Sequence, residues 1–130
     1  MTLDDVVDLQ NRFMIAFDVA LGGGALLAPE ATLRVLGHDP PSEDAAWLFR
    51  RCGPIWLTFA AAHALAAQRG RRKDWWALAW LRATELATDA LWARSPAFTR
   101  PGARAAMTSA GLANLAMTLA FGARGRGGRR

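Results

Sequence analysis

The sequence contains a single cysteine, Cys52, so no disulfide bond can form within the chain. No Cys/His spacing typical of a structural zinc site is present, and the Glu-x-x-His pairs of four-helix di-metal sites are missing. We therefore expect no metal centre. The phosphate-binding loop, the dinucleotide fingerprint and the G-x-S-x-G motif are also absent, so no common catalytic class is indicated and a cofactor stays unknown.

The start of the chain lacks the basic segment of a secretory signal peptide. It reads TLDDVVDLQ, which is acidic, so we expect the first apolar segment to remain as an uncleaved membrane anchor. The net charge is +5, but the basic residues lie between apolar segments and at the end of the chain. That distribution is typical of membrane topology, whereas nucleic-acid binding needs a basic face, and we expect no nucleic-acid partner.

Four apolar stretches are present, and each is interrupted by polar side chains. They read FMIAFDVALGGGALLA, WLTFAAAHALAA, WWALAWLRATELATDALWA and AAMTSAGLANLAMTLAFGA. In a membrane such polar residues are costly and usually face the protein interior or a cavity. We therefore predict an all-α fold, a four-helix antiparallel transmembrane bundle with residues 1–123 as its single domain. Residues 124–130 are predicted to form a flexible basic tail.

Capping residues and prolines predict the helix boundaries. Thr2 with Asp5 forms a plausible capping box for the first helix, residues 3–28, and Ser42 is a good N-cap for the second long helix. A short surface helix over residues 29–37 begins at Pro29 and is capped by Gly37. The remaining helices are expected over residues 42–68, 74–93 and 103–123.

The distribution of arginine and lysine predicts the topology. Basic residues crowd the loop around residues 69–73 and the tail, which lie on one side of a four-span bundle together with the N-terminus. The positive-inside rule then favours both termini in the cytoplasm, for a protein of the bacterial inner membrane. The tryptophans Trp75, Trp76 and Trp92 resemble interfacial belts.

The candidate site lies on the third long helix, where Arg82, Glu85 and Asp89 share one face. Asp18 is the natural partner of Arg82 or Arg51 across the bundle. We predict an interior ligand-binding cluster of Asp18, Arg51, Arg82, Glu85 and Asp89. The alternative is an ion-pair network that only holds the bundle together.

Two further polar residues are expected to be structural. His63 stands alone on an apolar helix, where a hydrogen-bonded core residue is more common than a ligand. Asn114 shares a face with Gly111 and Thr118 and is expected to make an interhelical hydrogen bond.

The order of these features resembles small bacterial four-helix membrane proteins that are similar in layout to the DoxX-like group. The matching elements are LLAPEATLRVLG, then RRCGPIWLTFAAAHALA, then the basic loop RGRRKD. The resemblance covers most of the chain and implies a four-helix membrane fold. It carries no catalytic residues over to this sequence.

Three functions remain open. The first is a binding module that holds a small amphipathic molecule, such as a quinone, a lipid or a pigment, at the polar cluster. The second is an accessory subunit of a larger membrane complex or a homo-oligomer. The third is an enzyme with Glu85 or Asp89 as acid or base. A soluble helical bundle is the alternative fold, because the first and third long helices are short or charged for single spans.

Overall fold

A computed structural model describes residues 2–127, which form five α-helices and no β-strand. The helices are α1 (Leu3–Leu27), α2 (Pro29–Val35), α3 (Glu43–Arg69), α4 (Arg72–Trp92) and α5 (Pro101–Gly127). The predicted all-α class, with four long helices and a short one after the first, is confirmed for this part of the chain.

The predicted caps account for two of the helix starts. The Thr2 side chain accepts a hydrogen bond from the Asp5 amide, and the Asp5 carboxylate accepts one from the Thr2 amide, which completes a capping box. Ser42 caps α3 by accepting from the Ala45 amide. Gly37 follows α2 with a φ of 105°, a backbone conformation that glycine adopts without the strain of a Cβ.

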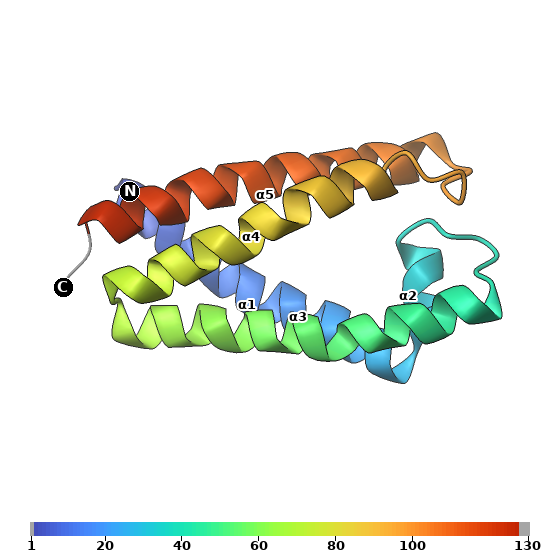
Figure 1. Cartoon of the computed structure of the whole chain (residues 1–130), viewed down its shortest axis with the longest axis horizontal. Coiled ribbons are helices and arrows are strands. Elements are labelled where there is room, and N and C mark those ends of the chain that lie inside the picture. Colours follow the sequence, from blue (N-terminus) through green and yellow to red (C-terminus); the bar gives the residue numbers. More distant parts are fainter. Residues whose placement is uncertain (1, 128–130) are drawn as a thin grey trace.

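The four long helices form two antiparallel pairs, α1 with α3 and α4 with α5 (Figure 1). The N-terminus, the connection from α3 to α4 and the last turns of α5 lie at one end of the molecule. The helix α2 and the connection from α4 to α5 lie at the other end. Since contacts within each pair greatly outnumber those between pairs, the interface between the two pairs is the looser one.

The end of α5 corrects the predicted flexible tail. Residues 124–127 are the last turn of α5, so the flexible tail expected over residues 124–130 is wrong for this part. Arg124 fixes this turn to α1 through ion pairs with Asp4 and Asp8 at 2.9 and 3.0 Å. Residues 128–130 lie outside the described part of the chain.

The tryptophans do not form the expected belt. Trp75 is 2% exposed and packs against Phe121 of α5 with 5.8 Å between ring centroids, because it lies on the face of α4 that turns toward α5. Trp76 is exposed, and Trp92 is half-buried with its indole N–H donated to His38. Of these three residues, Trp76 alone presents a large exposed ring.

Within residues 2–127, α5 is the one helix that combines the length and the mean hydropathy needed to cross a membrane. The helices α1, α3 and α4 do not reach that hydropathy, since charged residues lie within them and at their ends. The fold is therefore all-helical with one candidate span.

Glycines allow α1 and α3 to cross closely. A Cβ atom on Gly22 would lie 2.8 Å from the backbone oxygen of Gly53 and 2.9 Å from Cγ of Leu57. A Cβ on Gly53 would in turn lie 2.9 Å from the backbone oxygen of Gly22. This crossing holds α1 against α3 beside the residues of the candidate site.

We predict that Gly22→Ala lowers the free energy of unfolding by about 1–3 kcal/mol, because the added methyl group meets backbone that cannot move away cheaply. Gly23→Ala is the matched control, since a Cβ there meets no atom within 4 Å. The control should be neutral, or stabilising by up to about 1 kcal/mol, through helix propensity. Thermal unfolding of both variants by circular dichroism under identical conditions measures the difference, and equal stability would contradict the close crossing.

Candidate functional site

Arg82 is the centre of a polar network inside the bundle. The residue is 1% exposed, and its side chain forms an ion pair with Asp18 of α1, whose carboxylate is fully buried. Its Nε atom donates to Nε2 of His63 at 3.1 Å, and its Nη1 atom donates to Oε2 of Glu85 at 2.9 Å. The guanidinium therefore connects α4 to both α1 and α3.

The network continues from His63 to Asn11. Because Nε2 of His63 accepts from Arg82, its proton lies on Nδ1, which donates to Oδ1 of Asn11 at 2.5 Å. Asn11 in turn donates from Nδ2 to the backbone oxygen of His63 at 3.0 Å. The imidazole is thus neutral and held in one tautomer and one orientation.

The structure confirms three contacts predicted from the sequence. Arg82 pairs with Glu85 one turn further along α4, as the i, i+3 spacing indicates. Of the two arginines considered for Asp18, Arg82 is its partner. Asp89 lies on the same face of α4 and accepts a hydrogen bond from Asn114 of α5 at 2.7 Å, which is the interhelical bond expected of Asn114.

The placement of Arg51 in the cluster is wrong. Arg51 is exposed on α3, whereas the inward positions of this helix include Phe49, Gly53 and Trp56. Arg51 lies two residues from both Phe49 and Gly53, so on a helix of 3.6 residues per turn it points away from the bundle.

Sequence reasoning treated His63 as a core residue and missed its contact with Arg82. His63 is a hydrogen-bonded core side chain, as expected, but its hydrogen bonds are part of the site. One signal was available: Asn11 and Asp18 are seven residues apart on one face of α1, and both reach the same region of α3 and α4.

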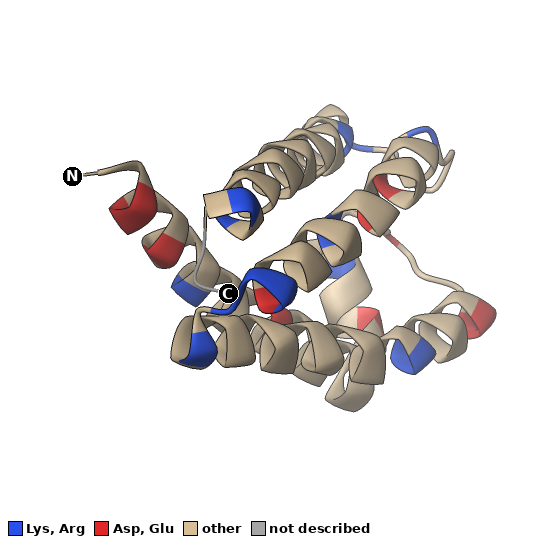
Figure 2. Ribbon diagram, turned by 60° about the vertical axis from the view of Figure 1, so that its left-hand side comes forward, with Lys and Arg blue, Asp and Glu red and all other residues tan. Residues whose placement is uncertain are grey.

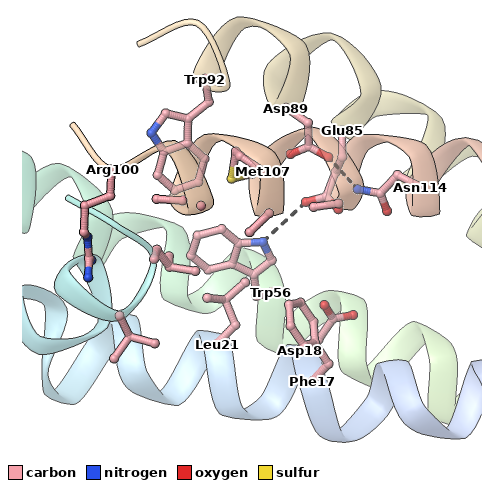
Figure 3. A pocket seen from close by; sticks show the side chains of 16 residues that line it. Phe17, Asp18, Leu21, Trp56, Glu85, Asp89, Trp92, Arg100, Met107 and Asn114 are labelled. Carbon is pink, nitrogen blue, oxygen red and sulfur yellow. Dashed lines mark hydrogen bonds between the residues drawn. The ribbon is translucent and has the colours of Figure 1, made fainter. Parts of the chain in front are cut away.

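A cavity of about 690 Å³ lies next to this network, between the α1/α3 pair and the α4/α5 pair (Figure 3). Its apolar walls include Phe17, Leu21, Trp56, Trp92 and Met107. Alanines of α5 complete the wall opposite α1. All five helices contribute residues, and the lining from α2 and from the start of α5 places the cavity toward the end of the molecule opposite the termini.

The polar groups gather at one side of the cavity, where Asp18, Glu85, Asp89 and Asn114 line it. Trp56 donates its indole N–H to Oε1 of Glu85 at 3.3 Å. Among the described residues, two buried oxygens at this side have no hydrogen-bond partner, Oδ1 of Asp18 and Oδ1 of Asn114. Unpartnered buried acceptors are costly, which makes them informative about what the cavity accepts.

The other side of the cavity is lined by Trp92 at the end of α4 and by Arg100 of the connection to α5. Trp92 donates to Nε2 of His38 at 2.7 Å, and burial lowers the pKa of His38, so the imidazole remains a neutral acceptor. Arg100 is exposed at this side and donates to the backbone oxygen of Arg34 at 2.9 Å. Figure 3 shows Arg100 across the cavity from the carboxylates.

The polar groups of this lining are carboxylates, an amide, two indoles and a guanidinium. No serine, threonine or cysteine lines the cavity, so the described lining offers no hydroxyl or thiol nucleophile. Within residues 2–127, no group of three or more His, Cys, Asp or Glu side chains is placed to hold a metal ion. The cavity offers apolar walls with carboxylate and amide groups at one side.

Compared with protein-family models, curated proteins and solved structures, the chain matches none.

We predict that Arg82→Met destabilises the fold by about 3–5 kcal/mol, because it leaves the buried Asp18 carboxylate without its partner. Removing the stranded charge in the Asp18→Asn/Arg82→Met double variant should recover part of this loss. Arg51→Met, on the exposed face of α3, should change stability by less than about 0.5 kcal/mol. Thermal unfolding of the three variants tests the assignment, and a cost for Arg51→Met as large as for Arg82→Met would overturn it.

Proposed function

We propose that this protein is a membrane-embedded helical bundle that binds a small amphipathic ligand in the cavity between its two helix pairs. The single observation that carries the ligand proposal is the cavity of about 690 Å³ itself, which has apolar walls and polar groups gathered at one side. That arrangement is typical of sites that orient a small molecule by its polar end. A lipid, a pigment or a similar small molecule fits this description.

The distribution of polar and apolar side chains supports the membrane location. Asp18, His63 and Arg82 are at most 1% exposed, whereas Trp80 is 70% and Leu119 65% exposed. A soluble protein buries its large apolar residues and keeps charges at the surface. The opposite arrangement suits a bilayer, in which charged residues face the protein interior.

The exposed surface of the helices also lacks charge along their middle segments. In residues 13–27, 52–68, 75–92 and 105–123, the charged side chains are Asp18, Arg82, Glu85 and Asp89, and each is buried or half-buried. Figure 2 shows most of the basic residues near the helix ends and in the loops. In addition, only 22% of the apolar window of α5 is buried, so this helix offers most of its apolar surface to its surroundings.

The positions of the charged loops support a topology. The basic connection from α3 to α4 lies at the same end as both ends of the described chain (Figure 1). The positive-inside rule favours the cytoplasm for this end, in a protein of the bacterial inner membrane. The cavity would then open toward the opposite side of the membrane.

The exposed apolar faces favour a second candidate, an accessory subunit of a larger membrane complex. Leu112, Leu115 and Leu119 form an exposed stripe on α5 at spacings of three and four residues. Such a stripe contacts either lipid or a partner helix. In that case the polar network would hold the bundle together and the cavity would have no ligand.

Native mass spectrometry on protein extracted in mild detergent separates the two candidates. The proposal predicts a reproducible bound small molecule that is lost in Ala110→Phe, because Ala110 lines the cavity and a phenyl ring there would project into the space of the ligand. Ala113→Phe is the matched control on the exposed side of α5 and should retain the molecule. A chain without a small molecule, or one bound to other polypeptides, would contradict ligand binding and favour the subunit role.

A further inference from the structure

The hydrogen-bonding atoms left free at the polar side of the cavity are acceptors. Oδ1 of Asp18 and Oδ1 of Asn114 are buried without a partner, and the two side chains are 0% and 6% exposed. Both side chains line the cavity. A ligand that fills this region must therefore donate hydrogen bonds to satisfy them.

Each donor nitrogen near these acceptors already has one hydrogen-bond partner. Nδ2 of Asn114 donates to Asp89, and the indole N–H of Trp56 donates to Glu85. Each of the three guanidinium nitrogens of Arg82 is engaged with Asp18, His63 or Glu85. A ligand whose head offers only acceptors, such as a quinone carbonyl or a carboxylate, would leave Oδ1 of Asp18 and Oδ1 of Asn114 without a donor.

The charges of the same region also favour a ligand with a cationic head group. Three carboxylates, on Asp18, Glu85 and Asp89, line this side of the cavity, and the guanidinium of Arg82 pairs with the first two. Arg100 does not offset them, since it lies across the cavity and is exposed. Excess negative charge away from water is unfavourable, and a bound cation would compensate it.

From these observations we infer that the cavity selects a cationic amphiphile whose head is an ammonium group with N–H donors. This inference rests on the proposed function and narrows its ligand class. The ammonium group would donate to Asp18 and Asn114 and lie near the carboxylates of Glu85 and Asp89. Its apolar body would pack against Trp56 and Trp92, whose ring faces also attract cations.

A matched set of three ligands tests the inference: 1-adamantylmethylamine, 1-adamantylmethanol and adamantane-1-carboxylate. They share one apolar body and differ in whether the head is a cation, a neutral hydroxyl or an anion. Binding to the full chain in phosphatidylcholine nanodiscs is followed by calorimetry and by tryptophan fluorescence, since Trp56 and Trp92 line the cavity. We expect the amine to bind about tenfold more tightly than the alcohol, and the carboxylate not to bind saturably.

Asp89→Asn is the test variant, because asparagine keeps an oxygen that can accept from Asn114 and removes only the charge. It should weaken binding of the amine severalfold and leave that of the alcohol unchanged. Asp44→Asn removes an exposed carboxylate of α3 outside the cavity and should change neither the binding of the amine nor that of the alcohol. An equal effect of the two variants on amine binding would overturn the assignment.

The outcomes separate this inference from the proposed function. If the alcohol binds as tightly as the amine, the ammonium selectivity is wrong while ligand binding stands. If none of the three binds, both are overturned. Adding phosphatidylethanolamine to the nanodiscs identifies the source of the head group. If this lipid competes with the amine for the cavity, the head group belongs to a lipid. If it does not compete, the ligand is a soluble amine.

Discussion

The burial of the Arg82 guanidinium is the constraint on which the rest of the structure depends. A permanently charged group that is 1% exposed needs an acceptor for each of its nitrogens, and one helix cannot supply them all. Asp18 from α1 and His63 from α3 supply two of these acceptors. The helices α1, α3 and α4 are therefore held together at the position of Arg82. Asn11 then fixes the tautomer of His63, which leaves its Nε2 free to accept.

The position of the cavity follows from the same constraint. Arg82 draws α4 toward α1 and α3, while α5 packs along α4 and touches α1 little. Toward α2 the two helix pairs separate, and the cavity lies there with the carboxylates of the network at one side. The structural role and the proposed ligand-binding role therefore meet in the same residues: Asp18 uses one oxygen to hold Arg82, and its second oxygen has no partner.

The parts of this structure that depend on local sequence could be predicted, and those that depend on helix rotation could not. The capping box at Thr2 and the pairing of Arg82 with Glu85 require only neighbours along one helix. The exposure of Arg51 and the burial of Trp75 depend on which face of each helix turns inward. Because these helices carry apolar residues on more than one face, the sequence does not determine the inward face. The cavity could not be predicted at all, because it results from the unequal packing of the two helix pairs.

The central claim, that the apolar outer surface lies in a bilayer, is tested most directly by spin-label accessibility. In a Cys52→Ala background, nitroxides at Leu65, Trp80 and Leu115 sample exposed apolar positions on three helices, and one at Asp44 samples a charged end. In lipid bilayers the account predicts that the first three labels collide with oxygen and are protected from a water-soluble nickel chelate, while the label at residue 44 shows the reverse. Nickel access at all four positions would contradict the claim.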